Sequence, residues 1–487
     1  MIEKYYSGVI EQIYNRIGKE TRNIVMANYS NDFSIENLEV IRRYQSNEDN
    51  VFFAYSEFSY NTLVGAYEPF LDIICNMHRR FIGGSFDDFQ KECGVYYLHR
   101  QVLNSYYETG ECFREETVLL NEVAYEQRRM TMAIADMLKK LSEVKPLMIV
   151  INRFQMASKS SIETIKYLID NPCANIGIVL GVNAIVKGTD STVEVWDRIV
   201  ESLEDRSAIY YIGSAGPLKN NVKTTNDDEL YITMNFEQSI QEASNIMEFL
   251  DFEQARRGCR IIEHKLKFED AWIDEKSLRR FYMVYARTSV LLGEMSKAIE
   301  LTNEYKALIP ENDSEHYLSL YYFMKGTCYM YQGKLEKAGN SAKSAYDYAV
   351  LAEDDTLIFK AELLSVMIKM SGWYNIFFCV QDIPVSDEII EKLIKHGYRN
   401  HLAHIYIYAY DNSRDVVKQS FYDESLLKHF TKGLELAKEI GNEQLVYDAY
   451  QKTIMLASTS GLNEIAFLYV IRTYEFMKGH GNIYVAR

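Results

Sequence analysis

The chain has 487 residues, which is too long for one ordinary hydrophobic core and predicts two or three domains. A hydrophobic content of 47% with 25% charged residues is typical of a globular protein, and no apolar run approaches the roughly 20 residues of a membrane span. The formal net charge of −16 argues against direct nucleic-acid binding, because proteins that bind nucleic acid present a basic face to the phosphates.

The N-terminal segment and the cysteines indicate a cytoplasmic protein. Residues 1–17 have the spacing of an amphipathic helix and lack the features of a signal peptide. The seven cysteines are scattered, with no C-x-x-C pair and no framework of the secreted type, so we expect reduced thiols.

The first half of the chain alternates short apolar runs with amphipathic stretches. The expected strands are residues 23–27, 51–55, 147–151, 175–182 and 208–212. The expected helices are residues 35–44, 67–73, 115–143, 160–169 and 189–203. This alternation predicts a parallel sheet of about five strands with helices on both faces.

The most informative stretch is Lys145–Asp170. An apolar run at Leu147–Ile151 predicts a buried strand, Asn152–Ser158 is a polar break, and helical spacing follows. A polar tip between a buried strand and a helix is where an α/β nucleotidase holds the acids that bind Mg²⁺.

This stretch resembles the Walker B region of signal-transduction NTPases of the STAND class, which are AAA-related switches with helical-repeat tails. The positions that carry the resemblance are Phe154, Gln155, Met156, Ala157, Ser160 and Ser161. The family has three acids at the positions held here by Asn152, Arg153 and Ser158. An amide is a poor Mg²⁺ ligand and an arginine repels the metal. The resemblance therefore implies a nucleotide-site framework that lacks the acids that bind Mg²⁺.

The phosphate-binding loop of that family is also changed. Laid on the family pattern, the two glycines fall at Asn28 and Phe33, the lysine at Ser34 and the hydroxyl at Ile35. No G-K-[ST] sequence occurs anywhere in the chain, so neither a tight glycine loop nor a phosphate-neutralising lysine is present. The vestigial nucleotide site therefore comprises Asn28, Phe33, Ser34, Ile35, Asn152, Arg153 and Ser158, and we expect no catalytic residue, cofactor or metal.

From Phe236 onward the sequence is helical with a period near 34 residues. The clearest repeat, Ser319–Ala352, has tetratricopeptide consensus residues in register at Tyr322, Gly326, Tyr329, Gly333, Ala338 and Ala345. Weaker repeats precede and follow it, one of them marked by Gly372 after an expected helix at residues 356–371. The paired helices expected at residues 425–441 and 443–460 resemble the repeats of maltose-activator-type bacterial regulators.

These features predict an α/β parallel-sheet, P-loop-NTPase-like domain at residues 1–218, a linker at 219–235 and an all-α tetratricopeptide-like superhelix at 236–487. The polar stretches 382–385 and 412–416 are expected loops between helices.

Three other sets of residues have two readings each. His396, His401 and His404 are either structural or metal ligands without an acid or cysteine at close spacing. Glu68 and Asp72, one helical turn apart, are either a solvated helix face or an acid/base pair. The glycines at 83–84 are either a helix stop or a phosphate loop.

Three hypotheses follow for function. The first is a non-catalytic regulator or scaffold whose repeats bind a protein or peptide, with an ATPase-competent paralogue as a further partner. The second is an ATPase with an atypical site or a nucleotide-binding STAND-type switch. The third is a peptide-sensing regulator that controls transcription through a DNA-binding partner.

Overall fold

A computed structural model of the protein describes residues 2–29, 38–46, 50–59, 63–120, 122–183, 186–189, 193–213, 223–225, 235–268, 273–312, 314–374, 387–409, 424–459 and 461–479. The chain divides into two compact units. The sheet unit comprises Met1–Val95, His99–Phe113 and Glu126–Ser277. The helical unit comprises Tyr96–Leu98, Arg114–Tyr125 and Leu278–Arg487. The domain boundaries expected from the sequence stay a prediction.

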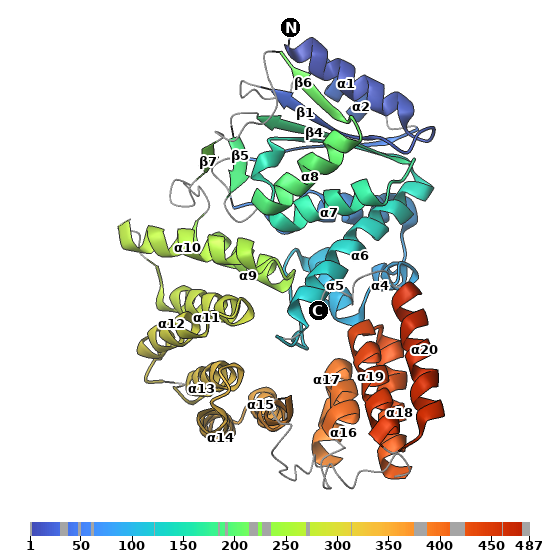
Figure 1. Ribbon diagram of the computed structural model, residues 1–487. Helices are drawn as coiled ribbons and strands as arrows, with labels where there is room; N and C mark the ends of the chain where they lie inside the picture. Colours follow the sequence, from blue (N-terminus) through green and yellow to red (C-terminus); the bar gives the residue numbers. More distant parts are fainter. Residues whose placement is uncertain are drawn as a thin grey trace. The chain divides into compact units, whose positions relative to one another are not determined.

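The sheet unit is built on five parallel strands in the order β2-β3-β4-β1-β6 (Figure 1). Their bounds are β1 Ile24–Tyr29, β2 Phe52–Glu57, β3 Leu147–Asn152, β4 Ile176–Asn183 and β6 Ile209–Ile212. Every residue of β3 and β4 is buried, as near-continuous apolar runs predict for inner strands of a parallel sheet. The predicted small parallel sheet is thus present.

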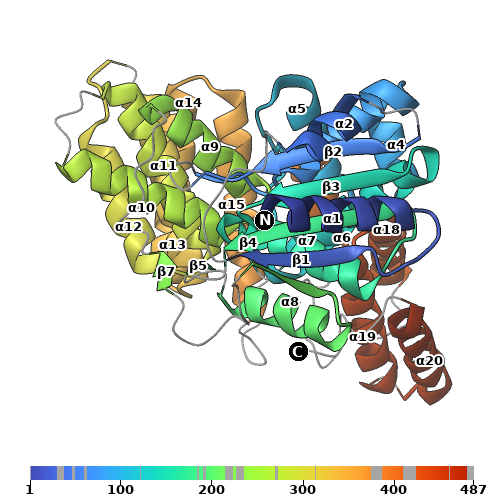
Figure 2. The same cartoon turned by 90° about the horizontal axis from the view of Figure 1, so that it is seen from above.

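Helices cover both faces of the sheet. Helices α1 (Ile2–Arg16) and α2 (Glu39–Ser46) contribute Tyr6, Ile10 and Ile41 to a buried core with β1 to β4. Helices α7 (Lys159–Asp170) and α8 (Val193–Asp205) lie on the opposite face (Figures 1 and 2). The amphipathic spacing seen in the sequence is what allows one side of each helix to bury against the strands.

The other elements up to residue 268 are α3 Phe70–Met77, η1 His78–Ile82, α4 Phe86–Glu92, α5 Tyr97–Thr109, α6 Val123–Val144, β5 Val186–Thr189, β7 Lys223–Thr225, α9 Phe236–Glu248 and α10 Phe252–Phe268, with a short 3₁₀ turn, η2, at Phe154–Met156. Strands β5 and β7 pair with each other in a second, two-stranded sheet, which the sequence did not predict. Gly83, with φ of 69°, ends the helix at Ile82, so these glycines form a helix stop.

Some predicted helices are wrong in their bounds. Residues 115–122 are not helical where the structure describes them, because the carboxylates there bind other helices of the helical unit. The helix predicted from residue 189 starts at Val193, since Thr189 ends β5. Helix α3 begins at Phe70 with Pro69 as its N-cap, so Glu68 precedes the helix.

The helical unit contains successive helices packed in pairs, with the bounds α11 Glu275–Leu291, α12 Met295–Ala307, α13 Ser314–Tyr331, α14 Leu335–Leu351, α15 Asp355–Tyr374, α16 Asp387–Lys395, α17 Arg399–His404, η4 Ile405–Ala409, α18 Glu424–Ile440, α19 Glu443–Thr459 and α20 Asn463–Gly479. The chain thus combines a small parallel sheet with mostly helical repeats. Helix α15 continues through Gly372, where the sequence predicted its end. The expected loops at 382–385 and 412–416 lie outside the described residues.

Small residues set the distance between α13 and its neighbours. Ala338 and Ala345 of α14 are fully buried. A Cβ on Gly326 of α13 would stand 3.0 Å from Leu364 Cδ2 and 3.3 Å from Ser341 Cβ, so a larger residue would press against both adjoining helices. The consensus residues of the predicted repeat therefore occupy a helix crossing, as stacked helical repeats require.

Among the described residues, no helix is both long and apolar enough to span a membrane. Six of the cysteines are described, and all six are free thiols.

The helix crossing gives a direct test of the repeat packing. Gly326→Leu should lower the melting temperature by several degrees, because a leucine at the crossing overpacks it by about 1–3 kcal/mol. The matched control is Gly339→Leu in α14, where a Cβ meets no atom within 4 Å. The control should be neutral or stabilising by up to about 1 kcal/mol, because glycine is a poor helix former. Equal melting curves for the two variants would refute this packing.

Candidate functional site

The carboxyl edge of the sheet is where a ligand would bind in this topology. The chain leaves β1 toward β2 on one side and leaves β4 toward β6 on the other, so these two neighbouring strands form a topological switch point. In open parallel sheets, ligands bind outside the carboxyl ends of the strands at such a point. Asn28, near the end of β1, and Asn152, at the end of β3, both lie at this edge and are buried.

Asn152, at the position of the first lost acid, forms a hydrogen bond with another side chain of the sheet. The hydroxyl of Tyr29 at the end of β1 donates a hydrogen bond of 2.7 Å to Asn152 Oδ1, and both residues are fully buried. Gly181 of β4 lies between them, and a Cβ there would stand 2.7 Å from Asn152 Oδ1. The bond therefore ties the ends of β1 and β3 together across β4 and takes up an amide oxygen that faces this edge.

Arg153, at the position of the second lost acid, is held as a cation against β2. Its backbone is in the left-handed region, with φ of 55°. Its guanidinium lies 3.2 Å from a carboxylate oxygen of Glu57 at the end of β2 and donates a 3.4 Å bond to the carbonyl of Phe58. The carboxylate that ends β2 is thus paired with an arginine.

Ser158, at the position of the third lost acid, caps α7. Its Oγ accepts a hydrogen bond from the backbone N–H of Ser161. The neighbouring backbone N–H, of Ser160, donates to a carboxylate oxygen of Asp251 at 3.0 Å. The other oxygen of Asp251 accepts from the N–H of Gln254 in the first turn of α10. One buried carboxylate therefore satisfies donors at two helix N-termini, where negative charge is favourable.

Gln155, which matches the family pattern, is also buried and structural. Its Oε1 accepts from the backbone N–H of Asn183 at the end of β4. The predicted loop residues Phe33, Ser34 and Ile35 lie outside the described residues. Their place in a vestigial site stays a prediction, as do the roles assigned to Asn28, Asn152, Arg153 and Ser158. The sequence did not point to Tyr29, Glu57 or Asp251, because each meets its partner only through the folded sheet.

The sheet unit also contains an acidic cavity of about 420 Å³. Its lining is Leu63, Gly65, Ala66, Glu68, Leu71, Asp72, Tyr106, Glu242, Asn245 and Phe249. Burial and the nearby carboxylates raise the pKa of Glu242 to about 7. Burial also raises the pKa of Glu68, while the N–H of Gly65 donates to it at 2.9 Å. The reading of Glu68 and Asp72 as a solvated helix face is therefore wrong for Glu68, which is half-buried in this cavity.

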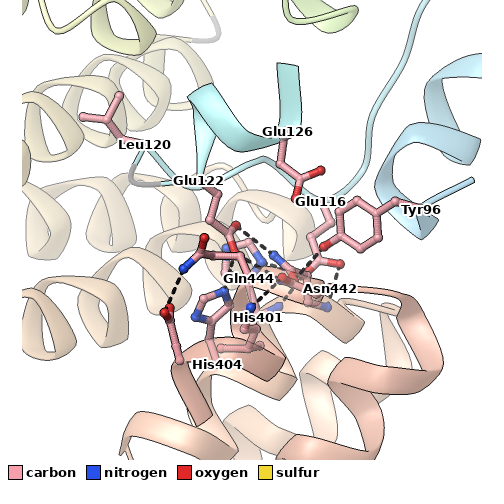
Figure 3. A network of polar contacts seen from close by, with 12 residues as sticks. Tyr96, Glu116, Leu120, Glu122, Glu126, His401, His404, Asn442 and Gln444 are labelled. Carbon is pink, nitrogen blue, oxygen red and sulfur yellow. Dashed lines mark hydrogen bonds and ion pairs between the residues drawn. The ribbon is translucent and has the colours of Figure 1, made fainter. Parts of the chain in front are cut away.

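A second polar cluster, the Glu–His network, lies inside the helical unit (Figure 3). Glu116 and Glu122 come from the segment before α6, and His401 and His404 come from α17. His401 Nδ1 lies 2.6 Å from Glu116, and His404 Nε2 lies 2.8 Å from Glu122. All four side chains are at least 96% buried.

The carboxylates of this network are fully hydrogen-bonded. Glu116 also accepts from the backbone N–H groups of Asn400 and His401, which are first-turn donors of α17. Glu122 also accepts from the amides of Asn442, at 3.1 Å, and Asn400, at 3.3 Å. Buried charges persist only when they are paired and hydrogen-bonded in this way.

The protonation states follow from these contacts. Burial alone would raise the pKa of Glu122, but the charge and hydrogen bond of His404 lower it to about 2. Burial lowers the pKa of His404, and the charge of Glu122 more than reverses this, so the net pKa is raised. His404 thus forms a buried ion pair with Glu122, while His401 lies within hydrogen-bond distance of Glu116. Among the described residues, no group of three or more His, Cys, Asp or Glu is placed to hold a metal ion.

Comparisons with known proteins add little. No known protein-family profile matches the chain, and no curated protein matches its sequence. Among solved structures, a Rap protein complexed with competence and sporulation factor is similar at a TM-score of 0.33 and 12% identity, over 84% of this chain and 98% of that one. A similarity at this level does not establish a shared fold.

The Glu–His network predicts a defined pH dependence of stability. Because the pKa of His404 is raised on folding, its contribution is complete below its ordinary value of 6.5 and is lost as pH rises through the folded pKa. Because the pKa of Glu122 is lowered, its contribution is complete above 4.5 and is lost as pH falls toward about 2. The His404–Glu122 pair should therefore stabilise the folded state most between pH 4.5 and 6.5.

His404→Gln should therefore cost about 3–5 kcal/mol near pH 6, and less at alkaline pH, because the wild type itself loses the charge there. The measurement is the melting temperature of the wild type and the variant, determined by calorimetry from near pH 6 to alkaline pH. The control is His316→Gln. His316 Nδ1 lies 3.2 Å from a carboxylate oxygen of Asp354 in a partly exposed pair, so its loss should cost at most about 1 kcal/mol. A pH-independent difference for His404→Gln would contradict the buried ion pair.

Proposed function

We propose that the chain is a non-catalytic regulatory or scaffold protein, in which a pseudo-NTPase domain is joined to helical repeats that bind a protein or peptide. The observation that carries the first part is the Tyr29–Asn152 hydrogen bond, with Arg153 paired to Glu57 beside it. Nucleotide chemistry needs Mg²⁺ on anionic oxygens at this edge, and the fold places an engaged amide and an arginine there.

The sheet topology supports the NTPase-like part of the proposal. The two segments on which the STAND resemblance rests follow β1 and β3, and these strands end at the same edge of one sheet, one strand apart. The backbone N–H of Asn183, at the end of β4, donates to Gln155 in the segment after β3. We therefore propose an ancestral nucleotide site that now serves packing, with no catalytic residue, metal or cofactor, and hence no ATPase activity.

The partner is proposed from the repeats. Gly326, Ala338 and Ala345 pack helices closely, and stacked helix pairs of this kind form extended surfaces that bind proteins or peptides. With the acidic balance of −16, the proposal excludes direct nucleic-acid binding and places the protein in the cytoplasm. An ATPase-competent paralogue remains the proposed second partner, because it would supply the nucleotide site that this chain lacks.

Restoring the first acid tests this account. Asn152→Asp should lower the melting temperature by several degrees, because a buried charge without a paired cation costs several kcal/mol. Millimolar Mg-ATP or Mg-ADP should shift neither the wild type nor the variant. A ligand that binds only the folded state must raise the melting temperature, so thermal denaturation with each nucleotide is the measurement.

The control for this variant is Asn340→Asp, the same change at an exposed position of α14, which should leave the melting temperature unchanged. A nucleotide-dependent rise in the wild type would show that the chain is a nucleotide-binding switch. A rise seen only in Asn152→Asp would show that the phosphate-binding half of the site is intact.

A further inference from the structure

Helix α20 has an apolar outer face. Among the described residues, it supplies five of the fifteen exposed large hydrophobic side chains, so no other described helix exposes as many. They are Phe467, Leu468, Val470, Ile471 and Tyr474, exposed by 40–66%. A concentration of exposed apolar side chains on one helix marks an interaction surface.

The inner face of α20 is already used. Ala466 and Thr473 are buried, and the rings of Tyr469 and Phe476 lie 5.7 and 6.0 Å from Tyr450 of α19 (Figure 1). Helix α20 is therefore apolar on both sides. A helix of this kind is normally covered on both sides.

The outer face carries an ordered stripe. Glu464, Phe467, Ile471, Tyr474 and Lys478 follow one another at intervals of three, four, three and four residues, the spacing of a helix–helix seam, over about 21 Å. The stripe has an acid at its amino end, a base at its carboxyl end and apolar side chains between them. Ile471 lies midway between Glu464 and Lys478, seven residues from each.

We propose that α20 packs antiparallel against α20 of a second copy of this chain, about a two-fold axis near Ile471. This arrangement brings the Glu464 end of each helix beside the Lys478 end of the other and buries the apolar centre. A parallel arrangement would bring Glu464 beside Glu464 and Lys478 beside Lys478. An antiparallel pair is self-complementary and closes after two copies, so the product is a dimer. This inference does not depend on the proposed pseudo-NTPase.

The first test is the molecular mass in solution, measured by light scattering after gel filtration over a range of concentrations. The wild type should approach twice the 56.7 kDa of one chain, with dissociation on dilution because the seam is short. Ile471→Glu should be monomeric, since it places two carboxylates at the centre of the seam. The matched control is Ile394→Glu on α16, an isoleucine that is 59% exposed, and it should dimerise like the wild type.

The second test reverses the charges. Glu464→Lys and Lys478→Glu should each weaken the dimer about tenfold, because two attractive end contacts become repulsive. The double variant Glu464→Lys/Lys478→Glu should restore the wild-type dissociation constant. Both positions are exposed, so each reversal should cost the folded monomer at most about 1 kcal/mol, through the helix dipole.

Three outcomes would overturn the proposal. A wild type that stays at 56.7 kDa at the highest concentration would show that α20 is not a dimer seam, and that another part of the chain or another protein covers it. A dimer that survives Ile471→Glu would place the interface elsewhere. Single charge reversals without effect would rule out the antiparallel arrangement.

Discussion

The hydrogen bond between Tyr29 and Asn152 is the constraint on which the account of the sheet unit depends. It joins the ends of β1 and β3 across β4, and the glycine at position 181 leaves the room for it. Both partners are fully buried, so the bond replaces hydration that the edge would otherwise need. A sheet edge that in related topologies faces a ligand is here stabilised by side chains of the chain itself.

The helical unit also buries polar side chains, and here two of them are glutamates. Glu116 and Glu122 are completely enclosed, and each is matched by an imidazole and by backbone or amide donors. Removing one partner would leave an uncompensated buried charge, which costs far more than the pair contributes. The segment that carries the two glutamates therefore belongs to the helical unit, although the helices α5 and α6 on either side of it belong mostly to the sheet unit.

Periodicity predicted the parts of the fold that depend on neighbours in sequence. The inner strands β3 and β4 and the helices α18 and α19 lie within a residue or two of their expected bounds, because buried runs and helical spacing are local signals. The expected helix at 115–143 is present only from Val123, because Glu116 and Glu122 before it bind residues about 280 positions away, at separations of 285 and 282. The sequence singles out His401 and His404 but not their partners Glu116 and Glu122. It likewise singles out Asn152 but not its partner Tyr29. Contacts of this length have no signature in a single sequence.

We propose that the carboxyl edge of the sheet does not bind a nucleotide. Equilibrium dialysis of the purified protein against radiolabelled ATP with Mg²⁺ tests it most directly, because the measurement needs no activity and no change in stability. The account predicts equal ATP concentrations on both sides of the membrane at every concentration. A saturable excess on the protein side, removed by unlabelled ATP, would contradict it and would make the chain a nucleotide-binding switch.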